Sequence, residues 1–417
     1  MSEDSNSKVI VVFINRFPYS TGEFFFEPEL IYIKEKFEKI YIIPMFPDNI
    51  NEMETYDGVK ILNISLTDCT SPFRAFIKNP GIIIKYIINE IFFSKYRFYF
   101  LRDLKNSYVH LINVVHKAKQ LIAIMNKNDI ASATVYCYWA NEYFSISAMM
   151  KNLKYNCRIV TRMHGYDFDP EQRKSDYFPF REQELKLAEK VVQISEYGYN
   201  KTKNMYPKIR NLYVSKLGVP DNGSSKIATY DTPYQIVSCS GFVELKRIPL
   251  LIEILSRLKS SYTWTHFGKS AGFEECYELA QNRLPPHSFK FMGYVDNVDL
   301  MDYYKSNAID LFINTSRLEG LPVSMMEAIS FGIPICGFNI CGIPEIVNDK
   351  TGILLSNAND IDVSARNIDQ FLTQNSRSIN FRRGVKEFWN ESFNSENNLN
   401  HFHQTFLSNT SLCQPNA

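Results

Sequence analysis

Short, continuous runs of apolar residues recur along the chain in two series, and they constrain the fold more than any other feature of the sequence. The run at 8–15 reads KVIVVFIN and is rich in β-branched residues, which is typical of a strand buried on both faces of a parallel sheet. Long stretches with helical periodicity separate successive runs, as expected when a crossover helix joins each strand to the next. The pattern predicts an α/β fold with doubly wound parallel sheets.

The two series indicate two domains, because a segment dense in turn-forming residues, GVPDNGSSKIATYDTP, separates them. A chain of 417 residues also exceeds what a single core usually holds. The remaining runs lie at 40–44, 131–138, 158–163, 191–195 and 212–217 in the first series and at 234–240, 262–267, 289–292, 308–314 and 334–338 in the second. We predict Rossmann-like domains at 1–220 and 221–390, and a C-terminal helix with a tail at 391–417 that returns to the first domain.

Composition excludes several classes of protein. Apolar residues make up 45% and charged residues 22% of the chain, and no run approaches the ~20 apolar residues of a membrane span. The N-terminus lacks the pattern of a secretory signal, and the eight cysteines are scattered without zinc-binding spacing. A net charge of +1 gives no overall attraction to nucleic acid. These features predict a soluble, cytoplasmic protein whose cysteines are reduced and do not bind a metal.

The most informative stretch runs from 314 to 355 and begins where a buried strand is predicted to end, which is where open α/β sheets bind ligands. A helix is expected at 323–331, and the amides at its amino end, including that of Ser324, suit a diphosphate. Glu319 precedes this helix and Glu327 lies within it, so two carboxylates could accept hydroxyl groups of a sugar and a ribose. Isolated glutamates are more often solvated charges, and the residues alone leave that reading open.

This stretch resembles the signature of glycosyltransferase family 4, which is retaining and has the GT-B fold, and in particular its polysaccharide-building branch. Glu319 and Glu327 match the Glu-x7-Glu motif of the family. The other matching positions are Ser316, Gly320, Leu321, Pro322, Ala328, Gly332, Pro334 and 342–347. The resemblance extends over nearly the whole chain and implies two domains that face each other across a cleft. It further implies that Glu319 lies by the reacting sugar, that the amides of Gly320 and Leu321 hold this sugar, and that Glu327 binds the ribose.

A second loop of the same domain, GFVELKR at 241–247, is expected to neutralise the phosphates. Lys246 matches a lysine of the family and is predicted to act as a point charge on the departing diphosphate. Phe242 stands where the family usually has an arginine, and Arg247 either compensates for it or begins the next helix. The following loop resembles a Gly-Asp-Gly turn in which Ser270 replaces the second glycine. The donor-binding glycines of these two loops are Gly241 and Gly268.

Three segments of the first domain carry the remaining candidates. His164 lies in RMHGYD, which resembles a His-Gly-x-Asp element of the family and implies that it positions the sugar and steadies charge. The segment 17–29 resembles an acceptor-side element in an altered order, although an ordinary strand-to-helix turn explains it equally well. The segment YWANE follows another strand, and aromatic faces stack well on sugar rings. The acceptor-side candidates are Thr21, Gly22, Glu23, Trp139 and Asn141.

A basic, aromatic segment at 74–105 holds seven basic residues and two acidic ones. Such a segment can lie peripherally on an anionic membrane, here the inner face of the cytoplasmic membrane. A partly buried pair of helices with a solvated basic face is an equal alternative. Nucleic acid is not expected as a partner, because no motif accompanies the charge.

The resemblance thus implies a metal-independent, retaining hexosyltransferase with UDP- or GDP-sugar as donor. The expected acceptor is a hydroxyl of a cell-surface glycan, such as a capsule or exopolysaccharide, or of a lipid-linked oligosaccharide. One alternative is a nucleotide-sugar 2-epimerase, which would share the donor site without an acceptor surface. Another is a non-catalytic sugar-nucleotide-binding partner of a polysaccharide assembly complex, which Phe242 and the altered segment at 17–29 suggest.

Overall fold

The computed structural model describes residues 8–19, 21–46, 53–173, 177–229, 231–356 and 358–408. The chain divides into two compact units. Unit 1 comprises Met1–Ile194, Gly198–Ser215 and Leu399–Ala417, and unit 2 comprises Ser195–Tyr197 and Lys216–Asn398. The C-terminal residues therefore group with the first unit, which is the return that the predicted fold requires.

Unit 1 is built on an eight-stranded sheet in the order β3-β4-β2-β1-β5-β6-β7-β8. Neighbouring strands are parallel, except that β3 and β4 form an antiparallel hairpin at one edge. The strands are β1 (Val9–Ile14), β2 (Lys39–Pro44), β3 (Thr55–Tyr56), β4 (Val59–Ile61), β5 (Ser132–Cys137), β6 (Asn156–Met163), β7 (Lys190–Gln193) and β8 (Leu212–Val214).

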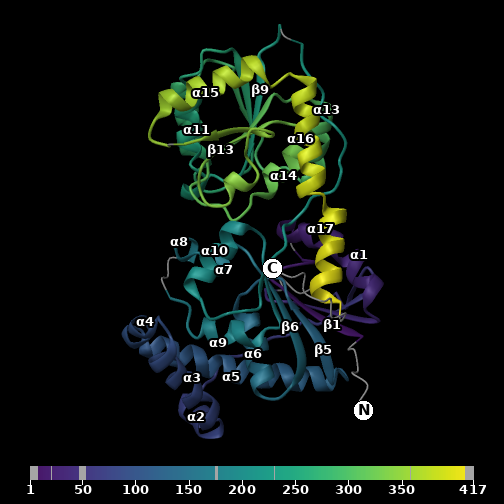
Figure 1. Cartoon of the computed structure of the whole chain (residues 1–417), viewed down its shortest axis with the longest axis vertical. Helices are drawn as coiled ribbons and strands as arrows, with labels where there is room; N and C mark the ends of the chain where they lie inside the picture. Colours follow the sequence, from purple (N-terminus) through teal and green to yellow (C-terminus); the bar gives the residue numbers. More distant parts are fainter. Residues whose placement is uncertain are drawn as a thin grey trace. The chain divides into compact units, whose positions relative to one another are not determined.

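Helices cover both faces of this sheet. Alternate strand residues point to opposite sides, and apolar residues on each side pack against helices. Tyr136 of β5 packs against Phe402, with ring centroids 5.5 Å apart, in a cluster that also holds residues of the first helix, whereas Phe13 of β1 stacks on Tyr143 on the other face. The helical elements, most of them labelled in Figure 1, are η1 (Thr21–Phe26), α1 (Glu27–Lys36), α2 (Pro72–Lys78), α3 (Pro80–Phe93), α4 (Arg97–Arg102), α5 (Leu104–Lys127), α6 (Glu142–Asn152), α7 (Gly165–Phe168), α8 (Pro170–Arg173), α9 (Arg181–Leu187), α10 (Glu196–Met205), α17 (Ser395–Phe402) and η4 (His403–Leu407).

Unit 2 has a fully parallel six-stranded sheet in the order β11-β10-β9-β12-β13-β14. The order reverses between β9 and β12, as in doubly wound nucleotide-binding sheets. Its elements are β9 (Tyr234–Cys239), η2 (Glu244–Lys246), α11 (Ile248–Leu255), β10 (Tyr262–Phe267), α12 (Phe273–Arg283), β11 (Phe289–Phe291), α13 (Asn297–Ser306), β12 (Leu311–Asn314), α14 (Val323–Ser330), β13 (Ile335–Phe338), η3 (Ile343–Glu345), β14 (Gly352–Leu355), α15 (Ile361–Gln374) and α16 (Ile379–Ser392).

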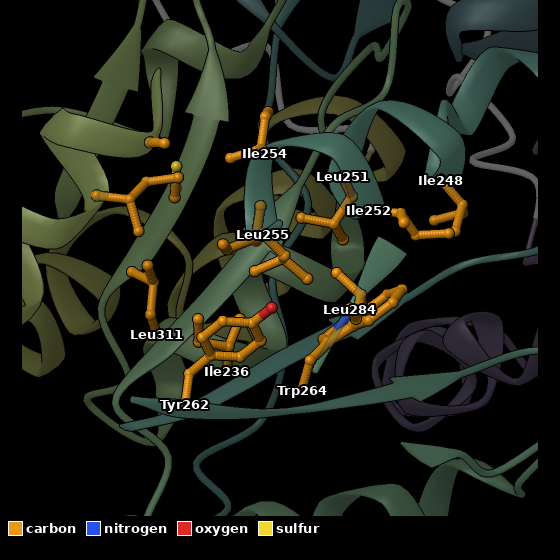
Figure 2. Close-up of a cluster of buried hydrophobic side chains, with 14 of the residues drawn as sticks. Ile236, Ile248, Leu251, Ile252, Ile254, Leu255, Tyr262, Trp264, Leu284 and Leu311 are labelled. Carbon is orange, nitrogen blue, oxygen red and sulfur yellow. The ribbon is translucent and has the colours of Figure 1, made fainter. Parts of the chain in front are cut away.

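The core of unit 2 lies between the sheet and the helices that cover it. In Figure 1, α11 and α15 lie on one face of the sheet and α13, α14 and α16 on the other. Figure 2 shows the apolar face of α11, with Leu251 and Leu255, packed over Ile236 and Trp264 of β9 and β10. All four of these side chains are fully buried, so the helix holds the strands that carry the donor-side loops.

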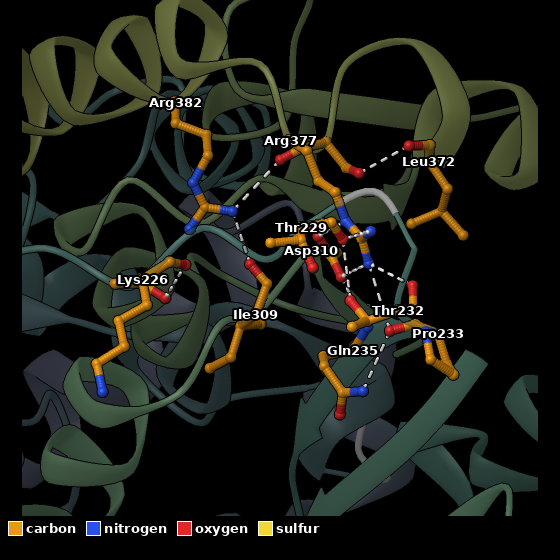
Figure 3. A network of polar contacts seen from close by, with 12 residues as sticks. Lys226, Thr229, Thr232, Pro233, Gln235, Ile309, Asp310, Leu372, Arg377 and Arg382 are labelled. Atoms are coloured by element: carbon orange, nitrogen blue, oxygen red, sulfur yellow. Dashed lines mark hydrogen bonds and ion pairs between the residues drawn. The ribbon is translucent and has the colours of Figure 1, made fainter. Parts of the chain in front are cut away.

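A polar network fixes the amino ends of the two central strands (Figure 3). Arg377 donates from Nε to Oδ1 of Asp310 at 2.8 Å, and Oδ2 of Asp310 accepts from the amide of Gln235 at 2.8 Å. The same arginine donates to the carbonyl oxygens of Thr229 and Thr232. The network therefore ties the segment before β9 to the start of β12 and to the turn between α15 and α16.

The predicted fold class is confirmed, and each predicted apolar run coincides with a strand. The ends of strands differ by one to three residues, as at 308–314, where β12 begins at Leu311. The hairpin of β3 and β4 was missed, because strands of two and three residues are too short to show a periodic pattern.

Candidate functional site

The donor-side candidates of unit 2 gather where the strand order reverses, between β9 and β12. The crossover connections leave these two strands in opposite directions, so their carboxyl ends face an open crevice in which such sheets bind ligands. The loop after β9 supplies Lys246 and the loop after β12 supplies Glu319, and these two side chains meet: Nζ of Lys246 lies 2.5 Å from Oε1 of Glu319. Their side chains are 30% and 13% exposed. An incoming anion can therefore reach the ammonium group while the carboxylate holds it in place.

Arg247 has a different place from Lys246, although the two residues are adjacent. It adopts a left-handed conformation with φ of 51° immediately before α11. Its Nε donates to the carbonyl oxygen of Thr315 at 2.7 Å, and Nη2 donates to that of Ser316 at 2.9 Å. These bonds tie the two loops of the crevice together. They favour the alternative in which Arg247 begins the helix over the one in which it replaces the missing arginine.

Phe242 points into the core of unit 2. Its buried ring packs against His266 and Phe291, with ring centroids 4.6 and 5.2 Å apart. The amide of Phe242 donates to Oγ of Ser270 at 2.6 Å, which links the loop after β9 to the loop after β10. The position before it, Gly241, lies close to the same hydroxyl, since an added Cβ would lie 3.3 Å from it. Ser270 thus joins the two donor loops.

Gly268 is required where the loop after β10 begins. Its φ is +137°, and a Cβ at this position would lie 1.9 Å from the carbonyl oxygen of Ser240. Any other side chain would push the two donor loops apart. Gly268 therefore acts through the backbone, which brings two strand ends close together.

The loop from Ser316 to Pro322 leads into α14 and is held at both ends. The amide of Ser316 donates to Oδ1 of Asn314 at 2.8 Å. The turn at Gly342 packs so tightly on the loop that a Cβ there would lie 1.8 Å from the carbonyl oxygen of Gly320. Leu321 is buried, and Pro322 directly precedes the helix. The amides of Met325 and Met326 donate to the carbonyl oxygen of Pro322, whereas those of Val323 and Ser324 come before the first hydrogen bonds of the helix and suit an anion.

Glu327 lies in the middle of α14 and does not contact Lys246. Its Oε1 accepts a hydrogen bond from Nδ2 of Asn297 at 2.8 Å. Burial raises the pKa of the Glu327 carboxyl to about 7, and the hydrogen bond from Asn297 offsets part of this increase. A carboxyl group held in this way can accept from a hydroxyl pair when ionised. Asn297 is a site residue that the sequence analysis missed, because it begins another helix and belongs to no motif.

The acceptor-side candidates of unit 1 also gather at a reversal of strand order, between β1 and β5. Glu23 lies in η1, whose first turn contains Thr21 and Gly22. Its carboxylate is buried and accepts from the amide of Phe17 at 2.8 Å and from Nε1 of Trp139 at 2.7 Å. The structure therefore brings the predicted Glu23 and Trp139 together. Glu23 is fixed by the backbone, so it orients the indole ring.

His164 lies against this pair. Its ring centroid is 4.1 Å from that of Trp139, and its buried Nδ1 lies 3.6 Å from a carboxylate oxygen of Asp167. Burial lowers the pKa of His164, and nearby Asp167 opposes this effect. Asn141 caps α6 by accepting from the amide of Tyr143 and donates from Nδ2 to Asn15. The lowered pKa favours a neutral imidazole, which is held between Trp139 and Asp167.

Two further observations concern metals and membranes. Among the described residues, no group of three or more His, Cys, Asp or Glu side chains is placed to hold a metal ion. None of the helices in the described ranges is both long enough and apolar enough to cross a membrane.

Residues 221–388 match the sequence model of the family "Glycosyl transferases group 1". Most of unit 2 is therefore similar to the domain that this family model describes. The match covers β9, β12, the loops that hold Lys246 and Glu319, and the helix that holds Glu327, so the family and the donor-side geometry coincide. The predicted relationship to glycosyltransferases is confirmed.

Curated relatives agree with this domain. The chain is 26% identical over 231 residues to the putative colanic acid biosynthesis glycosyltransferase WcaL of Escherichia coli (strain K12), covering 51% of this chain and 55% of the relative. It is 33% identical over 112 residues to the O-antigen chain mannosyltransferase B of Escherichia coli, covering 27% and 28% of the two chains. The match thus spans about half the length of the first of these relatives and less of the second.

Solved structures match over nearly the whole chain. The lipopolysaccharide outer core galactosyltransferase WaaB superposes with a TM-score of 0.65 at 13% identity, covering 94% of this chain and 98% of that one. HepE of Anabaena, solved with UDP and glucose, gives 0.64 at 12% identity, with coverages of 96% and 99%. These neighbours confirm the GT-B fold.

Proposed function

We propose that the protein is a retaining glycosyltransferase that moves a hexose-type sugar from a UDP- or GDP-sugar to a hydroxyl group of a glycan or lipid-linked oligosaccharide. The contact between Lys246 and Glu319 carries this proposal. It puts a cation and a carboxylate in the crevice between β9 and β12, beside the amino end of α14. A sugar diphosphate presents anionic oxygens to the first group and hydroxyls to the second.

The donor is held by its diphosphate and its ribose. The first-turn amides of α14 and the ammonium group of Lys246 bind the diphosphate, and Glu327 accepts from the ribose hydroxyls. HepE of Anabaena, which has the same fold, was solved with UDP and glucose, and this supports a uridine or similar nucleotide in the donor.

The reaction needs one bond to break and one to form at the anomeric carbon. The bond to the diphosphate oxygen breaks, and Lys246 stabilises the charge that this oxygen gains. The acceptor hydroxyl bonds to the same face of the carbon, and its proton passes to the departing phosphate oxygen. Neither proton transfer nor charge stabilisation requires a metal in this scheme, so we expect turnover to persist when a chelator is present.

The acceptor is bound by unit 1. The face of Trp139 offers stacking to a sugar ring, and the buried imidazole of His164 supports this indole, with ring centroids 4.1 Å apart. Relatives named for colanic acid and O-antigen biosynthesis support a cell-surface polysaccharide as the product. We place the protein in the cytoplasm, peripherally at the inner face of the cytoplasmic membrane, where lipid-linked acceptors are accessible.

A thermal-shift screen with UDP-, GDP-, ADP- and TDP-sugars tests the donor site. A ligand at 100 times its dissociation constant stabilises a fold by about 2.7 kcal/mol, so one nucleotide should raise the unfolding temperature clearly. Lys246→Ala should then slow turnover of the bound donor, measured as release of the nucleoside diphosphate. The matched control is Lys259→Ala, which removes an exposed lysine away from the crevice and should leave turnover unchanged.

The outcomes distinguish the proposed function from its alternatives. Binding of a donor without transfer or hydrolysis would favour the non-catalytic partner of an assembly complex. Conversion of the donor into its 2-epimer would identify an epimerase. If no nucleotide-sugar shifts the transition, the assignment of the crevice to a donor is wrong.

A further inference from the structure

Helices α2, α3 and α4 and the start of α5 expose an unusual amount of apolar surface on unit 1. Figure 1 shows α2, α3 and α4 on the outside of α5, at the edge of this unit. Exposed aromatic residues such as Phe73, at 72%, and Phe92, at 69%, leave most of their area in contact with solvent. The exposed apolar residues here are Phe73, Ile77, Ile84, Ile88, Phe92, Phe93, Phe98, Tyr99, Leu101 and Leu104. We call this set, with the basic residues among it, the α2–α4 surface.

The exposure follows from the sequence of α3, which is apolar on more than one face. Tyr86 and the residues one turn away on either side, Ile83 and Glu90, are buried against unit 1. Ile84, Ile88 and Phe92 repeat every four residues and therefore form a second stripe on another face of the helix. A helix that served only to cover the core would have polar residues at these positions. The described residues of unit 1 leave this second stripe partly uncovered, since Ile84 and Ile88 are each 44% exposed and Phe92 is 69% exposed.

The charges of this surface are almost all positive. Arg74, Lys78, Lys85, Lys95, Arg97, Arg102 and Lys105 are all exposed, and none of them forms a salt bridge with another described residue. Glu90 is buried, and only Asp103 places a partly exposed carboxylate among them. The surface thus combines a strong excess of cations with an apolar stripe.

We infer that the α2–α4 surface binds an anionic phospholipid bilayer and inserts its exposed aromatic and aliphatic side chains below the headgroups. The cations match the charge of the leaflet, and the apolar side chains match the acyl boundary. A second copy of the chain would bring two such sets of cations together and is disfavoured by repulsion. A nucleic acid would match the charges, but aliphatic side chains such as Ile84, Ile88 and Leu101 offer it neither charge nor a stacking face.

Insertion of apolar side chains changes how binding to the bilayer should depend on salt, compared with binding by charge alone. Attraction between exposed charges is screened by salt, whereas burial of apolar side chains is not. Binding therefore weakens at high salt but is not abolished. The inference deepens the peripheral placement given in the proposed function by naming the surface and the lipid, but it depends on none of the residues of the donor crevice and can hold if the transferase activity fails.

Co-sedimentation of the full chain with vesicles tests the inference. Vesicles of phosphatidylcholine with phosphatidylglycerol should bind the protein, and vesicles of phosphatidylcholine alone should bind it much more weakly. Phe92→Ser with Phe98→Ser should weaken binding by about tenfold or more, and Arg97→Glu with Arg102→Glu should do the same. The control is Ile379→Ser with Arg383→Glu, an exposed pair on α16 of unit 2, which should bind as the wild type does.

Thermal unfolding shows whether each variant is folded, and exposed positions should leave the transition unchanged. Equal binding by the wild type and the Phe92, Phe98 variant would overturn insertion. Absence of vesicle binding would overturn the bilayer as the partner, and self-association that the same variant abolishes, or retention of RNA, would identify what the surface binds instead. Nucleotide-sugar binding is measured on the same samples, so a failed donor site and a failed membrane surface are told apart.

Discussion

At the scale of single residues, Glu327 makes the stability of the protein depend on pH. Its pKa is raised to about 7 in the folded protein from an ordinary value of 4.5. The folded state therefore holds this proton more tightly than the unfolded state does, and the stabilisation present below pH 4.5 is lost as pH rises through about 7. Glu327→Gln keeps the hydrogen-bonding shape without the charge. We expect this variant to be more stable than the wild type above the folded pKa, by about 1–3 kcal/mol.

Denaturant unfolding at a series of pH values gives the free energy of unfolding of the wild type and of Glu327→Gln. Subtracting one value from the other cancels the contributions of the other titrating groups. Glu278→Gln, at an exposed position of α12, is the control and should follow the wild type at every pH. A constant difference between Glu327→Gln and the wild type across the series would contradict the raised pKa.

How far the site could be predicted depended on where each residue lies in the sequence. Lys246 and Glu319 follow buried strands, and the reversal of strand order brings the ends of those strands together. Asn297 could not be found, because its contact with Glu327 depends on how α13 packs beside α14. The role of Arg247 stayed open in the sequence, since only the structure shows the two carbonyl oxygens that bind its guanidinium group.

At the scale of elements, the long apolar strands were predictable. The two shortest strands and the helices that expose apolar residues to solvent were not. β1 and β2 lie in nearly continuous apolar runs, whereas β3 and β4 have too few residues for a pattern. The alternatives for 74–105 were a solvated basic face or a membrane surface, and three short helices in place of a helical pair occupy most of this segment. Which of their faces would be covered depended on tertiary packing.

The network around Arg377 predicts how strongly elements of unit 2 depend on one another. Arg377→Leu would leave Asp310, which is fully buried, without its ionic partner, and we expect a loss of about 3–5 kcal/mol. Hydrogen exchange of amides in β9 and β12 should reveal this loss. Arg366→Leu, at an exposed position of α15, should have little effect. Adding Asp310→Asn to Arg377→Leu should restore part of the stability, and failure to do so would show that the charge of Asp310 is not the cause.

At the scale of the whole molecule, the chain ends in the unit in which it began. Phe402 is fully buried in unit 1, where the guanidinium carbon of Arg162 lies 3.8 Å from its ring centroid. Arg158 donates to the carbonyl oxygens of Phe406 and Leu407 at 2.7 and 2.8 Å. The last described residues therefore complete a core whose other members lie more than 200 positions earlier in the chain. Apolar periodicity predicted helix here but could not identify the residues that it covers.

This arrangement predicts that a change near the C-terminus destabilises unit 1 and spares unit 2. Phe402→Ala should cost about 3–5 kcal/mol, because it leaves a cavity against Tyr136 and exposes the buried ion pair of Arg162 and Glu29. Hydrogen exchange should accelerate in β5 and β6, while the amides of β9 and β12 keep the rates of the wild type. Phe98→Ala removes the same ring from an exposed position of unit 1 and should leave both sheets unchanged. Faster exchange in β9 and β12 alone would mean that residues 399–407 support unit 2, contrary to the packing of Phe402.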